Sequence, residues 1–249
     1  MQRRKADFPI EGVKSALTSV ATAEEAKQTV GFYRSVVGKK VVMAVTGFIL
    51  FVFIVFHLAA NLLIYFPPEA NGTRLLNDYA AHLRALPALL WGARVLLLVA
   101  VILHIVAAWQ LTVLNKLEAR TTGYVKYTPI ASSYASRTMV WSGPIIFFYV
   151  IYHLLDLTFG TLNPSFQSGN VFHNVVADFE HPGVAIFYIF ANACLAFHLY
   201  HGIWSMCQSV GLAHPRYTPM LKKASVALAI AIGAGFCSIP LAVMTGLVR

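Results

Sequence analysis

Histidine is the residue type whose placement in this sequence most clearly suggests chemistry. Nine histidines occur, and four of them lie one each in successive apolar stretches, at His57, His104, His153 and His198. His201 lies one helical turn after the last of these. An ionisable side chain at membrane depth costs free energy and usually serves a site. One buried histidine has an ordinary explanation in a hydrogen bond between helices, but four successive stretches that each supply one indicate a shared ligand set.

The depth of each histidine in its stretch predicts how the four pair. His57 and His153 lie about 17 and 16 residues beyond the basic residues that open their stretches, so at 1.5 Å per residue both lie past the middle of a helix that spans a membrane. His104 and His198 lie about 12 and 13 residues before the far ends of stretches that run the opposite way. We therefore expect His57 to face His153 and His104 to face His198, at two levels.

Each histidine pair could bind one iron from both faces, which predicts two stacked haem b groups. Bis-imidazole ligation fills both axial positions and suits electron transfer rather than oxygen chemistry. Covalent haem attachment is excluded because the sequence has no Cys-x-x-Cys-His motif. Gly47 and Gly143 lie ten residues before the histidines of their stretches, and Gly202 lies one turn after His198. These glycines would let a flat macrocycle approach, although ordinary helix packing in membranes is the alternative explanation.

Other polar residues give weaker signals. Arg94 could neutralise a haem propionate or reach a quinone, or it could extend to the membrane interface. Arg137 belongs to a basic surface that could balance haem propionates. Asp156 could orient the imidazole of His153 or contribute to a quinone site, and a solvated helix end is the preferred interpretation. His201 is either a displaced ligand or a propionate partner. Proton exchange with a quinone is conceivable in the 67–87 segment, where a plain polar loop is preferred, at Glu69, Asp78 and His82.

The elements that must position these residues are long apolar helices. Hydrophobic residues make up 58% of the chain and charged residues only 12%, about half the charge of a soluble domain. Each apolar block has the roughly 20 residues that a helix needs to cross a bilayer, and none shows the alternation of a membrane strand. The blocks cover residues 41–66, 86–114, 139–159, 184–210 and 224–248. We predict an all-α integral membrane protein of five transmembrane helices, in which helices one to four form a haem-binding four-helix bundle and the fifth packs outside.

The net charge of +9 is explained by membrane topology rather than by a nucleic-acid partner. Fifteen of the 19 Lys and Arg residues precede the first block or lie after the second and fourth blocks, whereas the 161–181 loop has none. Because cytoplasmic segments are the basic ones, the amino terminus is expected in the cytoplasm and the carboxyl terminus outside. The chain then divides into a polar cytoplasmic segment, 1–34, and a five-helix cytochrome b domain, 35–249. No apolar run precedes Val41, so we expect no cleavable signal peptide. No nucleotide-binding motif occurs either.

Three segments resemble the diheme cytochrome b subunit of succinate dehydrogenases and fumarate reductases. The first, third and fourth helices of that family are similar to SVVGKKVVMAVTGFILFVFIVFHLAANLL (35–63), SYASRTMVWSGPIIFFYVIYHLL (133–155) and FHLYHGIWSMCQSVGL (197–212), the last followed by HPRYTP. The resemblance covers roughly residues 33–248 and implies four axial haem ligands, His57, His104, His153 and His198. It also favours His198 over His201, because Gly202 and Trp204 then match the family's register.

The resemblance further implies what the chain does. Such a subunit anchors a flavoprotein and an iron–sulfur subunit at the cytoplasmic face of the bacterial inner membrane, forming respiratory complex II. FAD and the iron–sulfur clusters belong to those partner subunits, and the succinate-oxidising site does too. Electrons pass from the iron–sulfur subunit to a proximal haem at His104 and His198, then to a distal haem at His57 and His153. They leave on a quinone, expected to be menaquinone.

One position departs from part of the family, and two other functions stay open. Some fumarate-reducing relatives carry a glutamate two residues before the fourth-helix ligand, where this chain has Ala196. This makes a proton path through that position doubtful and favours the succinate-oxidising direction modestly. The alternatives are a cytochrome b subunit of another quinone-linked oxidoreductase, such as a hydrogenase or formate dehydrogenase, and a haemless membrane anchor. The sequence leaves the oligomeric state undecided.

Overall fold

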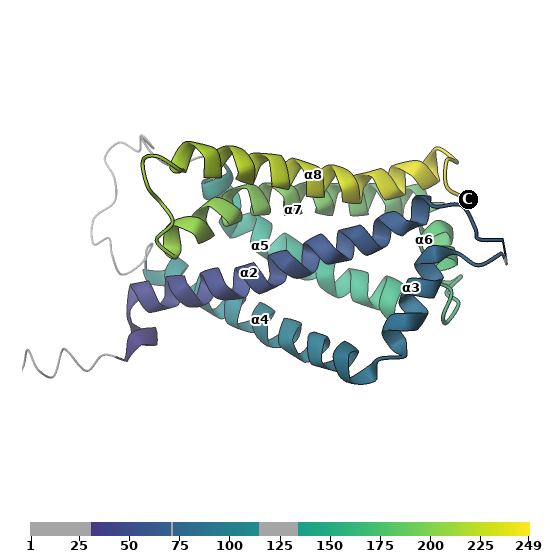
Figure 1. The fold of residues 1–249 in the computed structure, drawn as a ribbon, viewed down its shortest axis with the longest axis horizontal. Helices are drawn as coiled ribbons and strands as arrows, with labels where there is room; N and C mark the ends of the chain where they lie inside the picture. Colours follow the sequence, from purple (N-terminus) through teal and green to yellow (C-terminus); the bar gives the residue numbers. More distant parts are fainter. Residues whose placement is uncertain (1–30, 71, 115–133) are drawn as a thin grey trace, which may run out of the picture.

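The fold consists of long helices that lie side by side (Figure 1). The structure is a computed structural model, and it describes residues 31–70, 72–114 and 134–249, without the side chains of residues 134–137. Five helices are long and apolar enough to cross a membrane, and no strand occurs among the described residues. They are α2 (Val36–Asn61), α4 (Pro87–Val113), α5 (Tyr134–His153), α7 (Pro182–Ser209) and α8 (Thr218–Met244). The predicted all-α class with five membrane helices is confirmed, and the four-helix haem bundle within it stays a prediction.

The ends of these helices follow from local sequence signals. The Ser35 side chain caps α2 by accepting a hydrogen bond from the Gly38 backbone N–H at 2.9 Å. Proline stands in the first turn of α4, α7 and α8, where its missing N–H costs no helical hydrogen bond. Because of its cap, α2 begins five residues before the apolar block predicted at 41–66.

Two of the long helices continue into short turns of different winding. The 3-10 turn η2 (Leu62–Tyr65) extends α2, and the π-helical turn η4 (Leu154–Thr158) extends α5 directly after His153. A π turn widens the helix by one residue and changes the direction in which the following side chains point. Asp156 lies in this turn and is fully buried.

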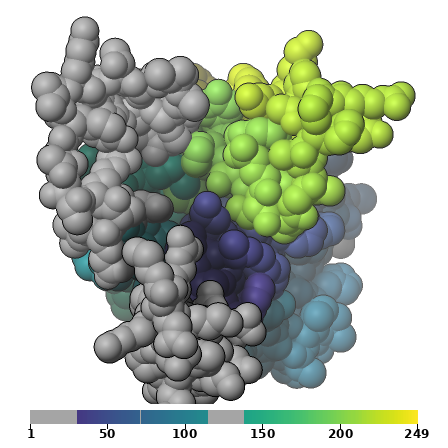
Figure 2. Space-filling view, turned by 90° about the vertical axis from the view of Figure 1, so that its left-hand side faces the viewer, coloured from purple at the N-terminus to yellow at the C-terminus, as the bar shows by residue number. Residues whose placement is uncertain are grey.

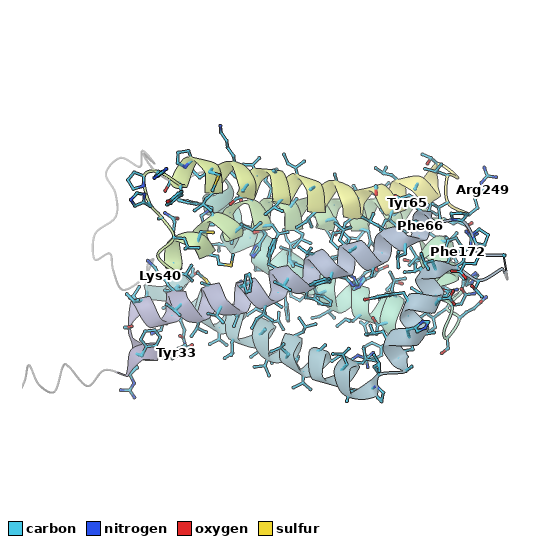
Figure 3. All side chains as sticks on the ribbon, viewed as in Figure 1. Tyr33, Lys40, Tyr65, Phe66, Phe172 and Arg249 are labelled. Carbon is cyan, nitrogen blue, oxygen red and sulfur yellow. The ribbon has the colours of Figure 1, made fainter. Side chains whose placement is uncertain are left out.

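Labelled side chains identify the two ends of the molecule. Tyr33 and Lys40 lie at one end, where the 3-10 turn η1 (Phe32–Arg34) precedes α2 (Figure 3). Figure 2 looks onto this η1 end and shows the start of α2 beside the connection between α7 and α8. Phe172 and Arg249 lie at the opposite end. Residues 1–30, which contain most of the predicted 1–34 segment, lie outside the described residues.

The end opposite η1 is covered by two short helices, α3 (Leu75–Arg84) and α6 (Val171–Phe179). The plain polar loop expected at 67–87 and the loop expected at 161–181 are therefore wrong, because each segment contains a short helix. The apolar face of α6 is buried through Phe172, Val175, Val176 and Phe179, which pack against Tyr188 of α7 and Ile239 of α8. We call this end of the molecule the α3–α6 end.

Helix α8 packs along α7 and also contacts α2. Two glycines permit this approach. A Cβ atom on Gly233 would stand 2.7 Å from the Ala196 Cβ atom, and one on Gly235 would stand 2.9 Å from Leu58 Cδ2. Ala196 therefore faces α8, and the interface leaves no space there for a longer side chain.

Candidate functional site

Four histidines from four helices form two pairs inside the helix assembly. The ring centroids of His57 (α2) and His153 (α5) are 5.9 Å apart, and those of His104 (α4) and His198 (α7) are 6.4 Å apart. His57 and His153 stand near the ends of their helices and therefore toward the α3–α6 end. The other pair, His104 with His198, lies farther from the α3–α6 end and closer to the η1 end, and we call it the deeper pair. These are the pairs and the levels that the depth argument predicts.

The spacing within each pair fits two imidazoles that share one iron. An axial nitrogen stands about 2 Å from the metal, and the ring centre lies roughly another 1 Å behind it, so the two centroids of a bis-imidazole site are about 6 Å apart. Both observed separations agree with this value. The chemistry of the donor set fits as well, because neutral imidazole is a common haem ligand. The four residues therefore fit two haem groups, although ligation itself stays a prediction.

A hydroxyl group lies at the Nδ1 atom of each histidine in the deeper pair. Thr46 Oγ1 is 3.2 Å from His104 Nδ1, and Ser142 Oγ is 3.2 Å from His198 Nδ1. Each hydroxyl donates a hydrogen bond to a carbonyl of its own helix, so its oxygen can accept a hydrogen bond from the imidazole N–H. This arrangement favours the tautomer with the proton on Nδ1. It leaves Nε2 with a free lone pair, as metal ligation requires.

The pair nearer the α3–α6 end has a different environment. The Tyr188 hydroxyl lies 3.5 Å from His153 Nδ1 and donates a 2.7 Å hydrogen bond to Asp156 Oδ2. His57 stacks on Phe53 at 5.2 Å between ring centroids and also lies near Phe236. Aromatic rings therefore enclose this pair, and a tyrosine and a carboxyl group border it on one side.

Asp156 is not the solvated helix end that the sequence analysis preferred. Its side chain has 0% exposure because the turn η4 directs it toward α6 and α7. A second buried carboxyl group, that of Asp178 at the end of α6, lies near it. Burial, followed by the contact with Asp156, raises the pKa of Asp178 to about 8, so its protonated form is favoured at neutral pH.

The other residues that the sequence suggested as haem or quinone contacts lie in different surroundings. Arg94 is exposed, and its guanidinium carbon lies 4.9 Å from the Trp91 ring centre on the same helix. His201 is half-buried one turn after His198. Gly47 packs against His104, since a Cβ there would stand 3.2 Å from His104 Cε1, so it admits the histidine ring itself. The side chain of Arg137 lies outside the described residues.

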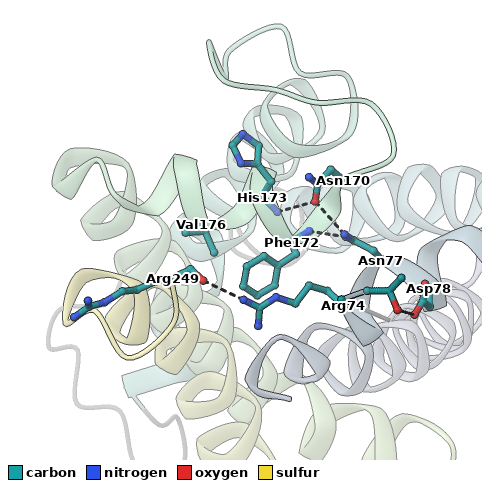
Figure 4. A pocket seen from close by; sticks show the side chains of 10 residues that line it. Arg74, Asn77, Asp78, Asn170, Phe172, His173, Val176 and Arg249 are labelled. Carbon is teal, nitrogen blue, oxygen red and sulfur yellow. Dashed lines mark hydrogen bonds between the residues drawn. The ribbon is translucent and has the colours of Figure 1, made fainter. Parts of the chain in front are cut away.

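The candidates of the 67–87 segment lie at the α3–α6 end. Asp78 lines an open pocket of about 420 Å³ between α3, α6 and Arg249 (Figure 4). There the Arg74 guanidinium lies 3.9 Å from the Phe172 ring centre and donates to the Arg249 carbonyl. Asp78 accepts a hydrogen bond from Thr73, and His82 is exposed and bonds to the Asp78 carbonyl. Nothing in this arrangement connects Glu69 or His82 to the histidine pairs.

Comparison with known proteins gives one match. Residues 118–236 match the sequence model of the succinate dehydrogenase/fumarate reductase transmembrane subunit. This part of the chain, slightly less than half of it, is similar to that family. No curated protein and no solved structure matches the chain.

The matched segment holds one histidine of each pair. It includes His153 and His198, and it also includes Asp156, Asp178 and Tyr188. The five apolar helices and this similarity to a transmembrane subunit support a multi-pass membrane protein.

Several residues around the histidine pairs were not predicted from the sequence. Thr46, Ser142 and Tyr188 were not singled out, because a lone hydroxyl in a membrane helix has no spacing signal. Thr46 and Ser142 lie 58 and 56 residues from the histidines that they contact. Asp178 was not singled out either. It could have been found through the apolar periodicity of α6, which buries one face of that helix.

Proposed function

We propose that this chain is the membrane-anchor cytochrome b subunit of a succinate:quinone oxidoreductase, holds two haem b groups and passes electrons to a quinone. The observation that carries the proposal is the pair of imidazole separations, 5.9 and 6.4 Å, at two levels of a chain with this family's sequence. Two such pairs give a route for electrons along the helix axis. A haemless anchor has no need for four paired histidines.

The residues have distinct roles in this proposal. His57 and His153 hold one group, and His104 and His198 hold the other. Bis-histidine haem supplies one-electron transfer when bound. Thr46 and Ser142 fix the tautomers of the deeper pair, and the ring of Phe53 supports His57. The surrounding helices exclude water, because most of their side chains are apolar.

Charge distribution supports the orientation and the partners. The described cations Arg34, Lys39 and Lys40 lie at the η1 end, which is therefore expected to face the cytoplasm. The iron–sulfur and flavoprotein subunits would dock there, with FAD and the clusters in those partners. The deeper pair, His104 with His198, would then receive electrons first. Menaquinone is the expected acceptor near His57 and His153.

Haem content of the purified complex tests the proposal. A dithionite-reduced minus oxidised spectrum with pyridine haemochrome quantitation should give two haems b per chain. His57→Ala and His198→Ala should each lose one haem or part of both, because each removes an axial ligand from a different pair. His201→Ala is the matched control, one turn from His198, and should retain both haems.

Other results would contradict the assignment. A complex without haem, or with haem that survives both ligand substitutions, would leave only a membrane anchor. Loss of a haem in His201→Ala with retention in His198→Ala would move the fourth ligand to His201. Subunits of a hydrogenase or formate dehydrogenase in the purified complex would instead assign this cytochrome b to another quinone-linked enzyme.

A further inference from the structure

Tyr188 of α7 stands between the proposed ligand His153 and the buried side chain of Asp156. Its hydroxyl donates a 2.7 Å hydrogen bond to Asp156 Oδ2 and lies 3.5 Å from His153 Nδ1. The exposure of Tyr188 is 3% and that of Asp156 is 0%, so water does not compete for these contacts. A hydroxyl group has one proton, and here that proton points to Asp156. Only the oxygen lone pairs of Tyr188 are therefore left for the imidazole.

The packing around Tyr188 fixes the position of its hydroxyl. The ring centroid of Tyr188 lies 4.9 Å from that of Phe179 on α6 and 5.3 Å from that of Tyr149 on α5, and both contacts are edge to face. Asp156 reaches the hydroxyl from the π turn η4, which follows His153 directly. Helices α5, α6 and α7 and the turn η4 therefore hold one hydroxyl group beside one ring nitrogen.

The deeper pair shows the same use of a hydroxyl group. There the serine and threonine hydroxyls donate to helix carbonyls and offer an oxygen to the Nδ1 atom of each histidine. For Tyr188, the carboxyl group of Asp156 takes the place of the helix carbonyl. The ring of His57 makes no hydrogen bond within the described part of the chain, so His153 is the member of its pair whose tautomer a hydroxyl group can fix.

We propose that Tyr188 and Asp156 are positioning residues that keep the proton of His153 on Nδ1, so that its Nε2 lone pair stays free for the iron. This inference rests on the proposed function. Neither residue gains or loses a proton in this role. Asp156 acts through Tyr188, because it keeps the hydroxyl proton turned away from the ring. A hydroxyl released from Asp156 would be able to donate to Nδ1, which would favour the tautomer with the proton on Nε2 and oppose ligation.

The arrangement predicts the direction of a change in redox potential. A hydrogen bond from Nδ1–H increases the electron donation of a ligated imidazole. Loss of the acceptor should therefore raise the midpoint potential of the haem at His57 and His153 and leave the deeper haem nearly unchanged. The 3.5 Å contact is longer than the 3.2 Å contact of Ser142, so the rise should be smaller than the one expected for loss of the Ser142 hydroxyl.

Redox titration and electron paramagnetic resonance of the purified complex test the role of Tyr188. Tyr188→Phe should retain both haems, raise the potential of the haem at His57 and His153, and shift the g-values of its oxidised low-spin signal. Tyr152→Phe is the matched control, because the Tyr152 ring lies 6.0 Å from that of Tyr188 but its hydroxyl makes no hydrogen bond to a histidine among the described residues. That variant should keep the wild-type potential and g-values. An unchanged potential and signal in Tyr188→Phe would overturn the inference while the haems remain.

A double substitution tests whether Asp156 acts through Tyr188. Asp156→Ala alone should shift the potential and g-values of the same haem, and its addition to Tyr188→Phe should give no further shift. Additive shifts would show that Asp156 acts by its own charge, which contradicts the positioning role.

Electron spin echo spectroscopy of the unmodified complex needs no variant to fold. It reads the remote nitrogen of a ligated imidazole, which should be a hydrogen-bonded N–H at the haem of His57 and His153. A remote nitrogen without a hydrogen bond on both ligands would contradict the inference. Absence of haem from the wild-type complex, read from the pyridine haemochrome alone, would instead overturn the proposed function.

Discussion

At the scale of single residues, Thr46 and Ser142 hold equivalent positions toward His104 and His198. Both hydroxyls are buried, and both lie 3.2 Å from a histidine Nδ1 while bonded to a carbonyl of their own helix. They also come from helices of the other histidine pair, since Thr46 is on α2 and Ser142 on α5. A hydrogen bond from Nδ1–H increases the electron donation of an imidazole to a bound metal.

Ser142→Ala should raise the midpoint potential of the haem at His198. Loss of the acceptor weakens electron donation from the imidazole and so destabilises the oxidised iron. We expect a shift on the order of tens of millivolts, the equivalent of one modest hydrogen bond. A redox titration followed at the haem absorbance measures it.

Ser209→Ala is the control for this substitution. The Ser209 hydroxyl bonds only to the Ser205 carbonyl of the same helix, so its loss should leave both potentials unchanged. Equal shifts in the two variants would show that the potential responds to any serine substitution in these helices, and would remove the assigned role of Ser142.

The sequence predicted the histidines of this site and missed their partners for a physical reason. His57, His104, His153 and His198 stand out because an imidazole is costly in an apolar stretch. A serine or threonine there costs little free energy, because its hydroxyl can donate a hydrogen bond to a carbonyl of its own helix. The burial of Asp156 escaped prediction because it depends on the π turn η4, which no local residue pattern indicates.

At the scale of elements, the position of α8 depends on small residues. Gly233 faces Ala196 of α7 and Gly235 faces Leu58 of α2, so α8 lies against both helices. Membrane helices associate mainly through such close packing, since lipid offers no hydrophobic driving force between them.

Gly233→Ala should lower the thermal stability of the purified complex. The added Cβ would stand 2.7 Å from the Ala196 Cβ atom, which is not the end of a flexible chain, so the helices must move apart. Overpacking of this kind costs about 1–3 kcal/mol. Loss of haem absorbance on heating reports the midpoint.

The same substitution at Gly92 of α4 provides the control. A Cβ there meets no atom within 4 Å, so Gly92→Ala should leave the midpoint unchanged or raise it slightly through helix propensity. A decrease as large as that of Gly233→Ala would mean that glycine itself, rather than the α7–α8 contact, matters for stability.

Elements were predicted well where they are long and apolar. All five spans were located to within about six residues, because a stretch of some 20 apolar residues has one stable structure in lipid. The short helices α3 and α6 have nine or ten residues and a mixture of polar and apolar side chains. Helix α6 packs against α7 and α8, and α3 packs against α4 and α6; such contacts lie beyond a local pattern.

At the scale of the whole molecule, orientation in the membrane is the main expectation still to be tested. The excess of Lys and Arg before α2 and after α7 predicts that the η1 end faces the cytoplasm. The 161–181 segment, which has no Lys or Arg, is then outside.

Two cysteine variants test this orientation in intact cells. Ser168→Cys, in the exposed connection before α6, should react with a membrane-impermeant thiol reagent added outside. Ala213→Cys, in the exposed turn between α7 and α8, should react only after the membrane is opened. The reverse pattern would invert the topology and exchange the proximal and distal haems. Native cysteines lie within α7 and α8, and the parent chain measures their background.

The interleaved pairing of the histidines has a consequence for biogenesis. The first membrane helix pairs with the third and the second with the fourth, so no helical hairpin contains a complete ligand pair. On the proposed ligation, a nascent chain cannot hold a six-coordinate haem until α5 has entered the membrane. The second haem must wait for α7, which also brings Tyr188 to His153. Truncated chains ending before α5 should therefore accumulate as apoprotein, a vulnerable stage that cellular proteases would recognise.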